Sequence, residues 1–125
     1  MEDKKPKNVE DLEVFKLSHE SALEVYKVTG RFPKEETYGL AQQMRRAAVS
    51  VPSNIAEGAN RYGKTEYGRF VSIAKGSAGE IYYQLLLARD LGYLTPDDFV
   101  RLRGGYLRVL QMLQKLIKSL KTNIV

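Results

Sequence analysis

Apolar residues recur every three to four positions along most of the chain, which is the period of amphipathic α-helices. Four such segments are separated by short stretches rich in glycine, proline and polar residues. They predict helices over roughly 11–30, 37–61, 64–91 and 96–121, and nothing alternates with the period of two that is typical of strands. The pattern therefore predicts an all-α fold, an antiparallel up-down-up-down four-helix bundle over 11–122, after a disordered tail over 1–10.

Each predicted helix has an apolar side that we expect to form the core. In the first helix this side is Leu12, Phe15, His19, Ala22, Leu23 and Tyr26. In the second it is Leu40, Met44, Ala47, Ala48, Val51 and Ile55. In the third it is Tyr67, Phe70, Val71, Ala74, Ser77, Ala78, Ile81, Leu85 and Ala88. In the fourth it is Phe99, Leu102, Tyr106, Val109, Leu110, Leu113, Leu116, Ile117 and Leu120. His19 is accordingly expected to be a core histidine that is hydrogen-bonded to a neighbouring helix, rather than a functional group.

The third helix is apolar around most of its circumference, since Ile73, Leu86 and Leu87 lie outside its main apolar side. Such a helix is either central to the bundle or also buried by a second chain. Its run of small residues "AKGSAG" contains Gly76 and Gly79, which lower helix propensity. We expect close helix packing to compensate for that loss.

Residues with special backbone preferences mark several helix ends. Asp11 is a plausible N-cap of the first helix, and Gly30 can end it in the left-handed conformation. In "LGYLTPDDF", Gly92 suits a C-cap, Thr95 an N-cap and Pro96 the first helical position.

Proline in the middle of the second helix is the most unusual local feature. Pro52 lacks an N–H group and crowds the carbonyl of Ala48, at a cost of roughly 3 kcal/mol in a helix interior. A kink and a break into two helices are both possible outcomes. The kink is favoured, because the apolar period keeps its phase from Leu40 to Ile55.

A polar stripe follows the second helix on the side away from its apolar residues. It comprises Arg46, Ser50, Ser53 and Glu57, with Pro52 and Asn54 beside it. One interpretation is a subunit interface in which Arg46 and Glu57 pair with residues of a neighbour. The others are a solvated face with an incidental proline, and a catalytic or ligand site. Against the last, Ser53 lacks the sequence context of a nucleophile, and a lone Glu and a lone His form no acid–base pair.

Composition narrows the classes of function. The 125 residues fit one domain, and the absence of cysteine with a single histidine argues against a metal site. No catalytic, cofactor-binding or small-molecule site is expected. The N-terminus carries no apolar run of the signal-peptide kind, no segment is long enough to span a membrane, and the lack of cysteine fits the cytoplasm.

Positive charge is concentrated in the fourth helix. The net charge is +5, and no acidic residue occurs from Phe99 to the end of the chain. Arg101, Arg108 and Lys115 recur every seven residues opposite the apolar side, with Lys118 nearby. We expect these charges to lack a neutralising acid. The stripe is either a solvated face or a surface for RNA or DNA phosphates, and it has no interleaved aromatic residues for base stacking.

Two segments, "RRAAVSVPSNIAEG" and "KTEYGRFVSIAKGSAGE", carry a family resemblance. With the surrounding residues 11–94, they resemble the four-helix-bundle proteins encoded in intervening sequences of bacterial large-subunit (23S) ribosomal RNA genes. The resemblance implies a homo-oligomer, a ring of five bundles, with no enzymatic activity. It also implies kinship in fold with the accessory protein of diversity-generating retroelements, which associates with nucleic acid through a basic surface.

Two hypotheses of function follow. The first is a non-catalytic, homo-oligomeric helical bundle that binds RNA or a ribonucleoprotein through basic surfaces. The alternative is a protein-interaction scaffold with no role in nucleic-acid binding. An unrecognised enzyme is a third hypothesis, which the sequence favours least.

Overall fold

The computed structural model describes residues 9–122 and contains four α-helices and two short 3-10 helices in that range. The 3-10 helices are η1 (Val9–Asp11) and η2 (Lys34–Glu36). The α-helices are α1 (Glu13–Thr29), α2 (Leu40–Ala59), α3 (Lys64–Asp90) and α4 (Pro96–Thr122). Of the predicted N-terminal tail, residues 1–8 lie outside the described part of the chain, and the next residues form η1.

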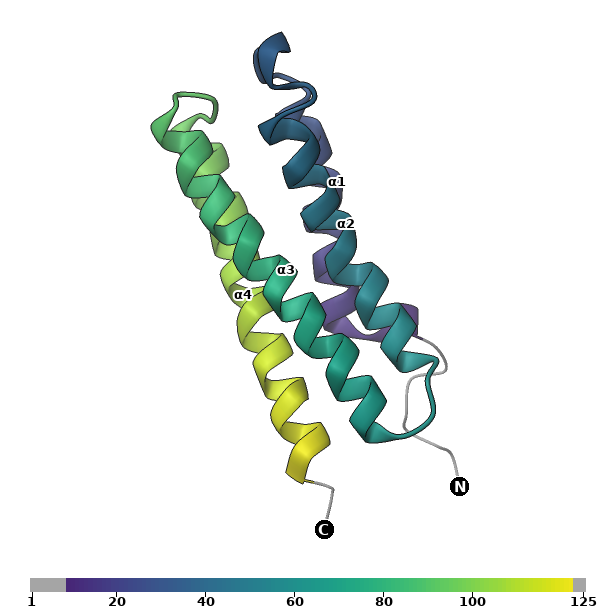
Figure 1. The fold of residues 1–125 in the computed structure, drawn as a ribbon. Helices are drawn as coiled ribbons and strands as arrows, with labels where there is room; N and C mark the ends of the chain where they lie inside the picture. The colour runs from purple at the N-terminus through teal and green to yellow at the C-terminus, as the bar shows by residue number, and fades with distance from the viewer. Residues whose placement is uncertain (1–8, 123–125) are drawn as a thin grey trace.

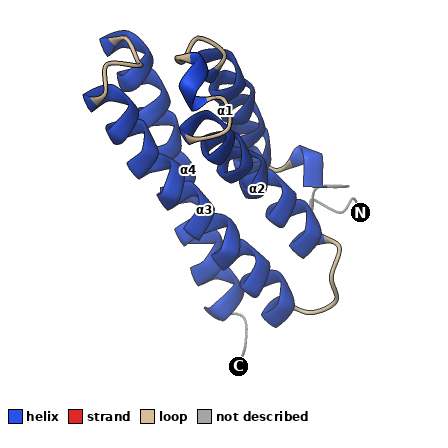
Figure 2. Cartoon of the chain, turned by 45° about the horizontal axis from the view of Figure 1, so that its top comes forward, coloured by secondary structure: helices blue, strands red, loops and turns tan. Residues whose placement is uncertain are grey.

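The helices form a bundle in which each packs on its neighbours in sequence and α1 also packs on α4 (Figures 1 and 2). Loops 30–39 and 91–95 lie at one end of the bundle and loop 60–63 at the other (Figure 1). This placement is consistent with the predicted up-down order. No strand occurs within residues 9–122, so the all-α, four-helix prediction is confirmed.

The predicted apolar sides of α2, α3 and α4 form the core. All six predicted residues of α2 are buried, and Ile81, Leu85, Tyr106 and Leu113 are fully inaccessible to solvent. Because three of the four helices turn the expected side inward, the 3.6-residue period was a sufficient guide for them.

The predicted core side of α1 is only partly right, because Ala22 is buried and Leu12 and Phe15 pack against the core, but the rest of that side is exposed. Leu23 is 59% exposed and Tyr26 46%, while the buried side runs through Val14, Ser18 and Ser21. The buried Ser18 hydroxyl donates a hydrogen bond to the Phe15 carbonyl of the same helix (3.0 Å), so it needs no partner on another helix. The same buried side carries Ala22, Val25 and Val28, so apolar residues still supply most of what α1 packs against the other helices.

His19 belongs to this exposed side of α1, which corrects the expectation of a core histidine. Its ring stacks on that of Phe15, with centroids 6.4 Å apart and an interplanar angle of 8°. The partner is thus one turn away on the same helix rather than on a neighbouring helix.

Helix ends follow the predicted signals in α4 and depart from them in α1. The Asp98 N–H donates to Thr95 Oγ1 (3.0 Å), Pro96 opens α4, and Gly92 has a φ of +83°. By contrast Leu12 rather than Asp11 takes the N-cap position of α1, and Gly30 has a right-handed φ of −65°.

One close helix approach depends on a glycine other than those expected. A Cβ on Gly58 would lie 2.9 Å from Phe70 Cβ and 3.2 Å from the Tyr67 carbonyl oxygen, so α2 and α3 approach there only because the side chain is absent. A Cβ on Gly76 or Gly79 would meet nothing within 4 Å, so these residues make no close helix contact within the bundle.

Glycine also marks the contact of α4 with α1. A Cβ on Gly105 would lie 3.4 Å from Ser21 Oγ, an ordinary van der Waals distance, so the two helices meet at this glycine without requiring it.

Pro52 lies inside α2, which continues without a break from Leu40 to Ala59. The proline ring is buried, so it contributes to the core as well as removing a backbone donor. The kink at this position stays a prediction.

Candidate functional site

The predicted polar stripe of α2 divides into separate parts in the structure. Ser50 Oγ lies 2.8 Å from Ser77 Oγ of α3, and Asn54 Nδ2 donates to Ser50 Oγ (3.0 Å) and to the Ser50 carbonyl (2.9 Å). These three residues form a polar seam between α2 and α3. The structure thereby shows an intramolecular role for Ser50 and Asn54.

Arg46 and Glu57 stand apart from that seam. Glu57 forms an ion pair with Arg61 one turn later (2.5 Å). Arg46 is exposed and makes no side-chain hydrogen bond or ion pair within residues 9–122. The predicted pairing of both residues with a neighbouring subunit stays a prediction.

An apolar groove runs between α1 and α2. It has a volume of about 380 Å³, and its lining is Phe15, His19, Ala22, Leu23, Tyr26, Val49, Pro52, Ser53 and Ala56. Leu23 and Tyr26 come from the unburied side of α1, and Val49 is 42% exposed. Ser53 and Pro52 of the predicted interface therefore border a hydrophobic surface rather than a polar one.

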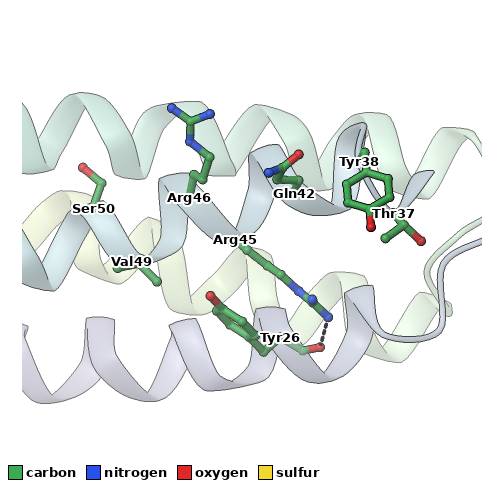
Figure 3. Close-up of a pocket in the computed structure, with 8 residues that line it drawn as sticks. All are labelled: Tyr26, Thr37, Tyr38, Gln42, Arg45, Arg46, Val49 and Ser50. Atoms are coloured by element: carbon green, nitrogen blue, oxygen red, sulfur yellow. Dashed lines mark hydrogen bonds between the residues drawn. The ribbon is translucent and has the colours of Figure 1, made fainter. Parts of the chain in front are cut away.

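A second cavity continues from this groove toward the η2 end of α2, since both are lined by Tyr26 and Val49. Its volume is about 600 Å³, and its other lining residues are Thr37, Tyr38, Gln42, Arg45, Arg46 and Ser50. Figure 3 shows Arg45 reaching across Tyr26, while Arg46 extends from the opposite side of α2. We call this hollow the Arg45 cavity.

Neutral groups hold the guanidinium of Arg45 in place. Its Nε donates to Thr29 Oγ1 (2.8 Å) and its Nη2 to the Tyr26 carbonyl (3.1 Å). The guanidinium carbon lies 4.7 Å from the centroid of the Tyr26 ring, a cation–π arrangement. Sequence reasoning did not identify this site, because its parts come from 26–29, 37–38 and 42–50 and converge only in the folded chain.

The predicted basic stripe of α4 is partly neutralised, which corrects the expectation that it has no nearby acid. Arg101 pairs with Glu24 of α1 (2.6 Å) and with Asp98 (3.1 Å). The prediction considered only the residues from Phe99 onward, so it left out Asp98 in the first turn of α4 and Glu24 of α1, which packs beside α4.

The other predicted basic residues of α4 keep their charge unpaired. Arg108, Lys115 and Lys118 are exposed, and no carboxylate within residues 9–122 forms an ion pair with them. We call these three the α4 basic surface. Arg103, by contrast, is used internally, because its guanidinium lies 3.7 Å from the Tyr82 ring centroid and donates to the Tyr82 carbonyl.

Groups that could bind a metal do not gather in the described part of the chain. No cluster of three or more His, Cys, Asp or Glu side chains forms there. Hydrogen bonding to the Glu36 carboxylate, together with burial and the negative charge of Glu36 and Glu35, raises the pKa of Tyr93. Burial alone raises the pKa values of Tyr67 and Tyr106. Within residues 9–122, no helix has the length and apolar character that a membrane crossing needs.

Comparison with solved structures supports the fold. The chain is similar to a crystal structure of a protein of unknown function, from the S23 ribosomal protein family of Bacteroides thetaiotaomicron. The TM-score is 0.76 and the identity 22%, over 84% of this chain and 98% of that one. No curated protein matches the chain significantly.

Comparison with protein families covers most of the chain. The family model described as "23S rRNA-intervening sequence protein" matches residues 10–115, a range that includes all of α1, α2 and α3 and most of α4. This match confirms the resemblance carried by "RRAAVSVPSNIAEG" and "KTEYGRFVSIAKGSAGE". The chain belongs to the 23S rRNA-intervening sequence protein family.

Proposed function

We propose that this chain is a non-catalytic, cytoplasmic protein that forms a cyclic homo-oligomer and binds RNA or DNA through phosphate contacts. The observation that carries the proposal is the α4 basic surface, whose three cations are exposed and lack carboxylate partners within residues 9–122. Phosphate contacts of this kind are independent of sequence and release counterions. A ring would repeat the surface in each copy, and the number five rests on the family resemblance.

Replacing Arg108, Lys115 and Lys118 by glutamine is expected to weaken nucleic-acid binding and its dependence on salt. The log–log slope of affinity against salt should become shallower by about 2, since each phosphate contact with a single strand contributes about 0.7. Fluorescence anisotropy of labelled RNA at several salt concentrations measures both quantities. The fold should persist, because all three side chains are exposed.

Arg101→Gln is the matched control for this triple variant. Arg101 lies on the same helix but already pairs with Glu24 and Asp98, so its removal should leave the salt slope nearly unchanged. Absence of binding by the wild-type protein at about 50 mM salt, where phosphate contacts are strong, would contradict nucleic-acid binding. Full binding by the triple variant would contradict the assignment to α4.

The groove between α1 and α2 supports the homo-oligomer. Leu23, Tyr26 and Val49 leave apolar surface exposed on a single bundle, and contiguous exposed apolar surface is typical of interaction sites. Ile73 and Tyr83 add exposed apolar surface on α3, 43% and 57% exposed. A neighbouring copy that covers the end of the groove at Phe15, Leu23 and Ala56 would remove that end from water and leave the adjoining Arg45 cavity open.

Leu23→Glu is expected to dissociate the oligomer while leaving each bundle folded. The side chain is 59% exposed in the single chain, so a glutamate there is tolerated by the monomer but not by an apolar contact with another copy. Light scattering and circular dichroism measure mass and helicity. A wild-type mass equal to one chain of 14.2 kDa would contradict self-assembly and would favour the alternative, a scaffold whose groove takes another protein.

A further inference from the structure

Arg45 is a cation fixed in position without a counterion. Two hydrogen bonds and the Tyr26 ring hold it, and none of these partners is charged. A guanidinium has five N–H donors, so about three remain after the bonds to Thr29 and to the Tyr26 carbonyl. Since no carboxylate in residues 9–122 pairs with Arg45, its charge and its remaining donors are available to an anion.

The Arg45 cavity suits a phosphate group better than the α4 basic surface does. Its lining contains no acidic residue, and Arg45 presents its remaining donors there; Arg46 lines the cavity from the opposite side of α2 and adds positive charge without converging on Arg45. Arginine presents a planar fork of donors that matches phosphate oxygens. Because Arg45 is already held by its neighbours, little side-chain entropy remains to be lost on binding.

An exposed aromatic ring lies beside these cations. Tyr38 lines the same cavity, is 88% exposed and makes no side-chain hydrogen bond within residues 9–122. Figure 3 shows it near Gln42, at the start of α2. Aromatic side chains next to arginines are typical of sites for unpaired nucleotides, where the base stacks and the phosphate pairs with the cation.

We propose that the Arg45 cavity binds one nucleotide of a single-stranded nucleic acid, with its phosphate on Arg45 and its base on Tyr38. The inference rests on the proposed nucleic-acid function, and it adds a site that distinguishes unpaired from paired strands. In a duplex the bases are stacked on one another, so no base face is free to stack on Tyr38.

Tyr38→Ala tests the stacking part of the site. Affinity for a labelled oligouridylate should fall about 5- to 150-fold, which is the range for losing one stacked base. Affinity for a duplex of equal length should not change, and Tyr38→Phe should bind like the wild type. Tyr62→Ala is the matched control, because Tyr62 is a 98% exposed loop tyrosine outside the cavity and should have no effect.

Arg45→Gln tests the phosphate part and should make the salt slope for oligouridylate shallower by about 0.7. Arg45 also joins α1 to α2, so circular dichroism must first show that the variant is folded. If it is not folded, Tyr38→Ala alone tests whether the cavity binds the nucleotide. Wild-type binding that Tyr38→Ala retains in full overturns the cavity and leaves the α4 basic surface standing. Absence of any wild-type binding overturns both proposals.

Discussion

Gly58→Ala is expected to destabilise the bundle by about 1–3 kcal/mol, the usual cost of overpacking, even though alanine is the better helix former. The new Cβ would lie 2.9 Å from Phe70 Cβ, 3.0 Å from Tyr67 Cδ1 and 3.2 Å from the Tyr67 carbonyl oxygen. The carbonyl belongs to the backbone of α3 and cannot rotate away, so the two helices would have to separate. Urea denaturation followed by circular dichroism measures the change.

Gly76→Ala is the control with the opposite sign. Gly76 is also helical, but a Cβ there meets nothing within 4 Å, so only the conformational term remains. We expect a gain of roughly 0.5–1 kcal/mol. If both variants were stabilised alike, the close approach of α2 and α3 at Gly58 would be wrong.

Tyr106→Phe is expected to stabilise the protein by about 1–3 kcal/mol at neutral pH. The Tyr106 side chain is fully buried in the core, and its hydroxyl has no hydrogen-bond partner within residues 9–122. Removing an unsatisfied buried hydroxyl removes a desolvation cost, while the ring keeps its contacts in the core. Thermal or urea unfolding measures the gain.

The same substitution should remove a loss of stability at alkaline pH. Burial raises the pKa of Tyr106 in the folded state, whereas the unfolded side chain ionises near pH 10. The free energy of unfolding therefore does not depend on this group below about pH 10. Between that pH and the raised pKa of the folded state, it falls by up to about 1.4 kcal/mol per pH unit, because only the unfolded side chain loses its proton. The phenylalanine variant lacks this dependence, so the two unfolding curves should diverge as the pH rises.

Tyr62→Phe provides the control for the alkaline experiment, since Tyr62 is 98% exposed and the change leaves the core intact. Its pH profile should match that of the wild type. Identical alkaline profiles for Tyr106→Phe and the wild type would show that the Tyr106 hydroxyl reaches solvent or a partner.

The candidate sites show where sequence reasoning from a single helix stops. The spacing of Arg101, Arg108 and Lys115 predicted a continuous basic stripe, and all three do lie exposed on α4. Glu24 comes from α1, more than seventy residues earlier, and its ion pair neutralises Arg101, the first residue of that stripe. No pattern within α4 contains this information, because ion pairing between helices depends on how their faces meet.

The amphipathic period by itself determined the all-α class, the four helices and the buried sides of α2 and α4, because one dominant apolar stripe leaves a helix a single way to face the core. It also identified the buried side of α3, although apolar residues reach most of the way round that helix. Only the tertiary structure decided which side of α1 is buried. Apolar residues lie on two sides of that helix, and the structure buries the side with Val14, Val25 and Val28. The same packing leaves Leu23 and Tyr26 exposed beside α2 and brings Tyr26, Tyr38 and Arg45 together. Sequence periodicity records which residues share a face, whereas the fit of neighbouring helices decides which face is covered.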